Sequence, residues 1–221
     1  MSWTKEKALG QIREIGLVPI VRAPSAEDAL LAAEAIIAGG IGILEVTMTV
    51  PHALQVMEKV ADKFGDKVLL GAGTILDTET GRAALLAGAQ FIVTPALNLH
   101  VIELARRYSK PCMPGALTPT EVVAAWQAGA DMVKIFPCGP VGGAKYIKAL
   151  KGPFPQIEML PTGGVNLETT PDFIKAGAAA VAVGGELVDL KSLREHKFDA
   201  IAATARLYVE AVRAARASLV K

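Results

Sequence analysis

The chain has 221 residues, 52% of them hydrophobic, which is enough for one full-sized domain. Its formal charge is +1 and its 23 basic residues are scattered, so nucleic acid and membrane surfaces are not expected partners. No run approaches the roughly 18 apolar residues of a membrane span, and the N-terminal stretch lacks a signal-peptide core. The two cysteines, Cys112 and Cys138, suggest neither a disulfide framework nor a metal cluster. We expect a single cytoplasmic domain, residues 1–221.

Short apolar runs alternate along the chain with longer amphipathic patterns, after an amphipathic N-terminal helix. The runs that we predict as strands span residues 16–22, 41–47, 67–71, 90–94, 111–114, 132–137, 157–162 and 180–183. The helices that we predict between and after them span residues 25–37, 78–86, 99–108, 118–128, 144–151 and 198–219, with one more opened by Pro51 and another ending at Lys175. This pattern gives eight strand-helix units.

A repeat supports that count. The pair Ala-Gly precedes every second predicted strand, at residues 38–39, 87–88, 128–129 and 176–177. Eight parallel strands alternating with helices in a chain of this length predict a TIM (β/α)8 barrel, here with an extra N-terminal helix. A doubly wound open sheet is the competing architecture. It calls for a glycine-rich turn after the first strand, and residues 22–25 read Arg-Ala-Pro-Ser instead.

A lysine lies in the middle of the apolar run 132–137. On a strand, Lys134 shares one face with Met132 and Phe136. Apolar surroundings disfavour the charged ammonium form, and a neutral amine is the nucleophile that forms Schiff bases with carbonyl compounds. The alternative is a structural lysine that reaches the strand end or pairs with a carboxylate.

Polar and glycine residues gather where the predicted strands end, which is where the chemistry of this fold is located. Glu45 interrupts the second apolar run, and either a salt bridge to Lys134 or a role as general base would explain it. The other residues that we expect around the same pocket are Arg22, Thr49, Gly73, Thr74, Pro95, Phe136, Gly163, Gly164, Gly184 and Gly185.

Six ordered motifs carry a family resemblance: residues 44–51, 71–74, 113–115, 133–137, 152–154 and 160–165. With these six motifs together, the chain resembles the 2-dehydro-3-deoxy-phosphogluconate (KDPG) and 4-hydroxy-2-oxoglutarate aldolases. The resemblance implies a class I aldolase that needs no metal or other cofactor and acts on a small keto acid, as a homotrimer. It implies cleavage of 2-dehydro-3-deoxy-6-phosphogluconate to pyruvate and glyceraldehyde 3-phosphate, and also cleavage of 4-hydroxy-2-oxoglutarate.

The same resemblance implies roles for the residues. Lys134 forms the imine and Glu45 transfers protons. Thr74 and amides near Gly73 hold the carboxylate, and Phe136 and Pro95 form apolar walls. The loops with Gly163, Gly164, Gly184 and Gly185 cradle the phosphate.

The chain departs from the family pattern at two places. Thr49 occupies the position of a family arginine, so carboxylate binding passes either to Arg22 or to Thr49 with Thr74. Gly185 stands where a serine is common, and Glu186 follows it. We expect a short helix to begin at Glu186, with its carboxylate pointing away from the phosphate.

Other functions remain open at this stage. The C4 epimer is undetermined, so a 2-dehydro-3-deoxy-6-phosphogalactonate aldolase is one alternative. A metal-independent phosphosugar isomerase or epimerase on the same barrel is another. The metal-dependent ones need ligands at strand ends, and none of His52, His100 and His196 lies in a predicted strand. A barrel kept only for binding would leave Lys134 and Glu45 without a task.

Overall fold

A computed structural model of the chain describes residues 3–219, except for the side chain of Leu190. Its strands are β1 (Leu17–Val21), β2 (Ile43–Thr47), β3 (Leu69–Gly73), β4 (Phe91–Val93), β5 (Cys112–Met113), β6 (Gly115–Ala116), β7 (Val133–Ile135), β8 (Met159–Pro161) and β9 (Val181–Val183). Its α-helices are α1 (Lys5–Ile15), α2 (Ala26–Ala38), α3 (Ala53–Phe64), α4 (Thr78–Leu86), α5 (Leu99–Arg107), α6 (Pro119–Gln127), α7 (Ala144–Lys151), α8 (Thr170–Lys175), α9 (Leu190–Arg194) and α10 (Phe198–Ala217). Two short 3-10 helices are η1 (Gly65–Lys67) and η2 (Gly139–Val141).

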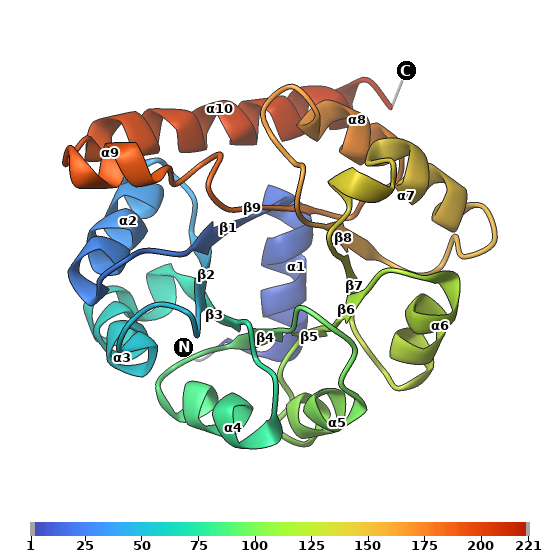
Figure 1. Ribbon diagram of the computed structural model, residues 1–221, viewed down its shortest axis with the longest axis horizontal. Helices are drawn as coiled ribbons and strands as arrows, with labels where there is room; N and C mark the ends of the chain where they lie inside the picture. Colours follow the sequence, from blue (N-terminus) through green and yellow to red (C-terminus); the bar gives the residue numbers. More distant parts are fainter. Residues whose placement is uncertain (1–2, 220–221) are drawn as a thin grey trace.

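The strands form a ring that the helices surround (Figure 1). One parallel sheet runs in the order β5-β4-β3-β2-β1-β9 and a second in the order β6-β7-β8. A parallel bridge between Thr162 and Ala182 joins β8 to β9. Strand residues such as those of β1 and β2 are buried throughout, as expected where helices cover the outside and side chains fill the inside. The predicted TIM barrel is confirmed.

The fifth barrel strand is divided, whereas the sequence predicted one strand over residues 111–114. Pro114 separates β5, which pairs with β4, from β6, which pairs with β7. A proline has no N–H for the ladder, so pairing on its donor side stops there. Its carbonyl still accepts a hydrogen bond from the Lys134 amide at 2.9 Å. The barrel therefore closes through the two halves of one strand.

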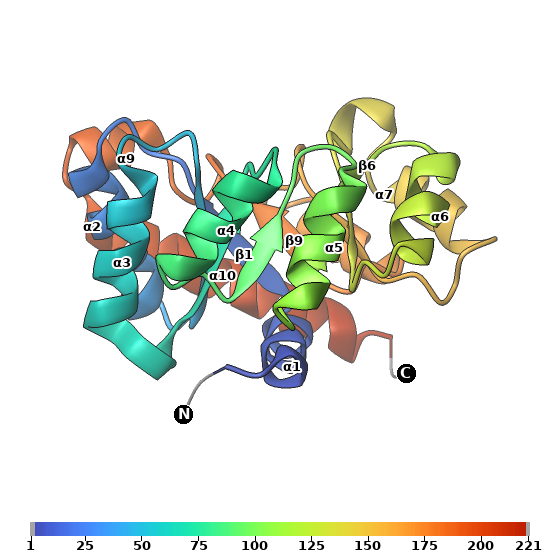
Figure 2. The same cartoon turned by 90° about the horizontal axis from the view of Figure 1, so that it is seen from below.

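Helix α1 lies across the end of the barrel where the strands begin (Figure 2). Thr4 caps it by accepting a hydrogen bond from the Lys7 amide, and Ala8, Leu9 and Ile12 are buried. Arg13 of α1 makes a double hydrogen bond to the carboxylate of Glu158, with both shortest contacts at 2.8 Å. The predicted extra N-terminal helix is confirmed, and it leaves the carboxyl ends of the strands uncovered.

Two predicted helix starts are wrong. Helix α3 begins at Ala53 rather than Pro51, because the chain first makes a turn in which the Val50 amide bonds the Thr47 carbonyl and His52 has a left-handed φ of 55°. No helix begins at Glu186. Residues 185–187 form a turn, and the next helix, α9, is capped by Asp189. None of the described helices is long and apolar enough to cross a membrane.

Candidate active site

Lys134 lies in the middle of β7 with only 6% of its surface exposed. Its amide is bound to the Pro114 carbonyl, and its partner in β8 is Leu160. The side-chain Nζ lies 5.2 Å from the centroid of the Phe136 ring, so these two residues share a face as their spacing predicted. Lys134 forms no ion pair with a described residue. The amine is thus held inside the barrel beside an aromatic wall.

Glu45 is the buried acid of the site, at 1% exposure in the middle of β2. Its Oε2 has no hydrogen-bond partner among the described residues. Burial raises the pKa of the Glu45 carboxyl, and the positive charges of Lys134 and Arg22 oppose that rise. The Lys134 charge acts on the Glu45 pKa, but no nitrogen–oxygen distance between these two side chains is 4.0 Å or less. The sequence allowed a direct salt bridge between Glu45 and Lys134, and the structure does not contain one.

Gly73 provides the space that the Glu45 carboxyl group occupies. A Cβ atom on Gly73 would lie 1.8 Å from Glu45 Oε1 and 2.5 Å from its Cδ. No L-residue other than glycine fits there unless the carboxyl group moves. Gly73 is paired with Thr47 at the end of β3, so the backbone itself places Glu45 near the open end of the barrel.

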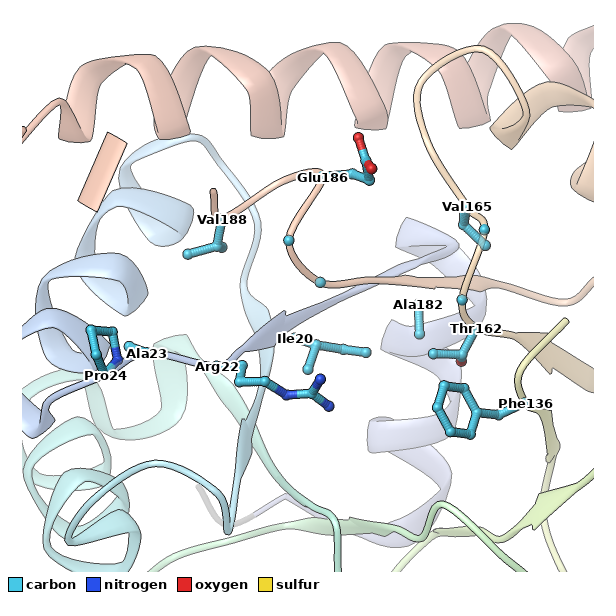
Figure 3. A pocket seen from close by; sticks show the side chains of 14 residues that line it. Ile20, Arg22, Ala23, Pro24, Phe136, Thr162, Val165, Ala182, Glu186 and Val188 are labelled. Carbon is cyan, nitrogen blue, oxygen red and sulfur yellow. The ribbon is translucent and has the colours of Figure 1, made fainter. Parts of the chain in front are cut away.

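A cavity of about 480 Å³ opens next to Phe136 (Figure 3). It is lined by Ile20, Arg22, Ala23, Pro24, Phe136, Thr162, Gly163, Gly164, Val165, Ala182, Gly184, Gly185, Glu186 and Val188. The Arg22 guanidinium points toward the middle of this space, in the direction of Phe136, whereas the Glu186 carboxylate points toward α10 (Figure 3). The Arg22 side chain has no hydrogen bond or ion pair within the described part of the chain. The cavity therefore holds a cation free to bind an anion.

Backbone amides add to this positive character. The N–H groups of Gly163, Gly164, Gly185 and Glu186 form no hydrogen bonds to other described residues. Gly163 and Gly164 both have a φ of 80°, a left-handed conformation that glycine adopts without strain. Unpaired amides on loops after parallel strands are suited to bind a phosphate or carboxylate. The predicted glycines thus meet Arg22 and Phe136 in one cavity.

The other predicted residues do not line that cavity, and Lys134 and Glu45 are among them. Thr49, Gly73, Thr74 and Pro95 come from the ends of β2, β3 and β4. Thr74 has a φ of 57°, which is rare for a β-branched residue and is typical of functional sites. Its amide has no hydrogen bond to a described residue. Pro95 is half-buried, and its carbonyl lies 2.4 Å from where a Cβ on Gly115 would be.

Buried threonines at strand ends were not singled out from the sequence. Thr162 is 4% exposed and lines the cavity. The Thr94 hydroxyl donates to the Ala96 carbonyl and accepts from the Gly115 amide, which fixes the loop that carries Pro95. The signal that could have found them is a hydroxyl at the end of an otherwise apolar run. His52, His100 and His196 are exposed, and no group of described side chains is arranged to hold a metal ion.

A (β/α)8 barrel with a lysine buried in it, and with a cavity next to Phe136 that presents a guanidinium and unpaired amides, is typical of barrel enzymes that act on small anionic compounds. The family model described as "KDPG and KHG aldolase" matches residues 9–204. The chain belongs to that aldolase family, and it is a lyase.

Individual relatives agree with the family model. The chain is 30% identical over 213 residues to the 2-dehydro-3-deoxy-phosphogluconate aldolase of Haemophilus influenzae, covering 96% of this chain and 100% of the relative. It is 36% identical to the 2-dehydro-3-deoxy-6-phosphogalactonate aldolase of Escherichia coli, covering 90% and 97%. Among solved structures, the KDPG aldolase of Legionella pneumophila, captured with pyruvate as a covalent carbinolamine, superposes with a TM-score of 0.84 at 29% identity, covering 90% and 96%.

Proposed function

We propose that this aldolase cleaves 2-dehydro-3-deoxy-6-phosphogluconate to pyruvate and glyceraldehyde 3-phosphate, with Lys134 as the Schiff-base residue. The observation that carries the proposal is that the two buried charged side chains of β2 and β7 face each other inside the barrel. They form no direct ion pair, so the Glu45 carboxyl group does not occupy the Lys134 amine. The Legionella relative carries pyruvate as a carbinolamine, the intermediate that precedes such an imine.

The chemistry follows from the amine. The Lys134 Nζ adds to the C2 carbonyl, and loss of water gives a protonated imine. Glu45 takes the proton of the C4 hydroxyl, the C3–C4 bond breaks, and its electron pair moves into the imine as an enamine. The aldehyde leaves, the enamine carbon regains a proton, and water releases pyruvate from Lys134. Phe136 and Pro95 exclude bulk water from the imine.

The two ends of the substrate need different partners. The free amides of Gly163, Gly164 and the turn at Gly185, with Arg22, suit the phosphate because they share one cavity. The free amide of Thr74, with Gly73, suits the carboxylate on the opposite side. Of the two carboxylate partners that the sequence left open, Arg22 is therefore assigned to the phosphate end instead.

Borohydride reduction in the presence of pyruvate tests the proposal. It should add one stable pyruvate-derived group to the peptide that contains Lys134, because only an imine is trapped. Lys145 and Lys148 are exposed controls on α7 that should stay unlabelled. Labelling of either of them in place of Lys134 would reject the assignment. An isomerase or epimerase, or a metal-dependent enzyme that chelators silence, would not be labelled at all.

The stereochemical series and the range of keto acids belong to the same proposal. One relative is named for the galactonate substrate and others are named KHG/KDPG aldolase. We therefore include cleavage of 4-hydroxy-2-oxoglutarate and retain the galactonate epimer as the alternative main substrate. Product analysis with each C4 epimer, phosphorylated and not, decides between them.

We also propose that residues 1–221 act as one domain, that three copies form a homotrimer, and that the enzyme is cytoplasmic. Light scattering should then give about three times the chain mass of 23.1 kDa. A mass of 23.1 kDa at working concentration would contradict the trimer.

A further inference from the structure

The Thr94 hydroxyl lies at the point where the fifth barrel strand is divided. Thr94 follows β4 and is 1% exposed. Its Oγ1 donates to the Ala96 carbonyl at 2.5 Å and accepts from the Gly115 amide at 3.1 Å. Both directions are fixed, because a carbonyl can only accept and a backbone N–H can only donate. The hydroxyl therefore gives its one hydrogen to the loop after β4 and receives one from the start of β6.

This hydroxyl fills a place in the hydrogen-bond ladder that normally belongs to the backbone. The Thr94 amide donates to the Met113 carbonyl at 3.3 Å, as expected between parallel strands. In a regular parallel ladder, the next bond would run from the Gly115 amide to the Thr94 carbonyl. The Gly115 amide donates to the Thr94 side chain instead. A side chain thus continues the barrel across the break at Pro114.

The other side of the same peptide group holds Lys134. The carbonyl of the Pro114–Gly115 peptide accepts a hydrogen bond from the Lys134 amide at 2.9 Å, while the N–H of that peptide donates to Thr94. Gly115 is also the residue that pairs with Lys134 between β6 and β7. A peptide group is planar, so its N–H and its carbonyl rotate together. The Thr94 hydroxyl and the Lys134 backbone are therefore bonded to opposite edges of one rigid unit.

We propose that Thr94 is a positioning residue for Lys134: its hydroxyl holds the Pro114–Gly115 peptide group in the orientation that places the Lys134 amine for attack on the keto acid. The inference rests on the proposed function for the role of Lys134, and it requires no contact between Thr94 and the substrate. Without the hydroxyl, the buried Gly115 N–H loses its partner, which is costly. Rotation of the peptide group toward another acceptor would displace the Lys134 backbone.

The test compares two buried threonines in the full chain. Thr94→Val keeps the shape of the side chain and removes the hydroxyl. Thr170→Val is the matched control, because Thr170 is fully buried at the start of α8 and its hydroxyl donates to the Asn166 carbonyl at 2.6 Å. Each protein is mixed with pyruvate well below its melting temperature, and the imine at Lys134 is trapped with borohydride at successive times.

Thr94→Val should slow imine formation by about 10- to 100-fold, because misplacing a reacting group by about an ångström has an effect of this size. The pyruvate concentration for half-maximal rate should hardly change, since the proposed carboxylate partners, Gly73 and Thr74, belong to β3 and the loop after it. Thr94→Ser keeps the hydroxyl and should restore most of the rate. Thr170→Val should form the imine as fast as the unmodified enzyme, even where its melting temperature is lower.

Equal imine rates in Thr94→Val and Thr170→Val would show that the Thr94 hydroxyl supports only the fold, and failure of Thr94→Ser to restore the rate would also overturn the proposal. Hydrogen exchange checks the link through the backbone: residues 132–137 should exchange faster in Thr94→Val than in the unmodified enzyme, and unchanged exchange would contradict the proposal.

If Thr94→Val does not fold, Thr94→Ala removes the hydroxyl without placing a methyl group against the Gly115 amide and is measured in its place. Absence of any trapping at Lys134 in the unmodified enzyme would instead reject the proposed function.

Discussion

The Glu45 carboxyl group is buried, and its Oε2 has no hydrogen-bond partner among the described residues. Unsatisfied buried carboxyl groups are rare and are typical of functional sites. As a base, Glu45 works only when ionised, and burial raises its pKa. As pH is lowered, Glu45 therefore becomes protonated at a higher pH than an exposed glutamate, whose pKa is about 4.3. We expect kcat/KM for cleavage to decline on the acid side of the pH profile at that raised pKa. Glu45→Gln should lower the rate by about 10²- to 10⁴-fold and should no longer show this acid-side decline.

Glu45→Gln should lower activity but raise the stability of the fold. A group whose pKa is raised by folding favours the folded state below that pKa, and this benefit is lost as pH rises through it. At pH 7, Glu45→Gln should therefore melt at a higher temperature than the unmodified enzyme, by about 2–4 °C per kcal/mol gained. The gain should shrink as pH is lowered. A variant that is inactive and also less stable at pH 7 would point to a structural role for the carboxylate.

Gly73 is predicted to act on catalysis through Glu45. In Gly73→Ala the new methyl group would overlap the carboxyl group, which must move by about an ångström or more. Misplacement on this scale costs about 10²-fold in rate, so kcat should fall while pyruvate trapping at Lys134 persists. Gly10→Ala is the matched control, because no heavy atom lies within 4 Å of its Cβ position in α1. It should leave kcat unchanged and stabilise the fold by about 0.5–1 kcal/mol.

At the scale of elements, the long C-terminal helix α10 is bonded to α1 at the N-terminal end of the described chain. Its Arg216 donates hydrogen bonds to the Glu14 carbonyl at 2.7 Å and the Ala179 carbonyl at 3.0 Å, which connects it to α1 and to the start of β9. Arg216→Met would leave both carbonyls without this partner. We expect a loss of about 1–3 kcal/mol in the free energy of unfolding, with kcat unchanged.

Arg213 offers the comparison on the same helix. Its side chain is exposed and has no hydrogen bond or ion pair to a described residue, so Arg213→Met should leave the melting temperature nearly unchanged. If both variants melted alike, the two bonds of Arg216 would carry no net stability, and α10 would be held by its apolar face alone.

Local signals predicted most elements and failed where distant contacts decide. Helices α4 and α7 match the predicted ranges 78–86 and 144–151, and α6 lies within its predicted range 118–128, opened by a capping box of Thr118 and Glu121. The division of the fifth strand at Pro114 was missed because it depends on which neighbour each half pairs with. The turn at Glu186 was missed because the Leu187 and Val188 amides both donate to the Gly184 carbonyl, and this single turn does not continue as a helix.

On the scale of the whole molecule, barrel closure gathers residues from opposite ends of the sequence. Arg22 follows β1, Phe136 follows β7, and the glycine pairs follow β8 and β9, yet all line one cavity (Figure 3). Strand parity and the barrel rule predicted that these residues share one end of the fold. They could not predict that the site divides into this cavity and a separate β2–β4 side with Thr49 and Thr74. That division depends on side-chain directions around a closed ring.

The cavity leads to a prediction about phosphate. Gly185 is exposed at its rim, and no heavy atom lies within 4 Å of the position of a Cβ, so Gly185→Ser fits without displacing anything. One added neutral hydrogen bond is worth about 0.5–1.5 kcal/mol. We expect KM for the phosphorylated keto acid to fall by up to about tenfold.

The unphosphorylated analogue serves as the internal control for this variant. It has no phosphate for the new hydroxyl to bind, so its turnover should hardly change in Gly185→Ser. The unmodified enzyme should already prefer the phosphorylated form, because Arg22 and four unpaired amides of the described chain are available to a dianion, while the Glu186 carboxylate points toward α10. Equal kcat/KM for both forms in the unmodified enzyme would mean that this cavity binds no phosphate, and the natural substrate would then be an unphosphorylated keto acid.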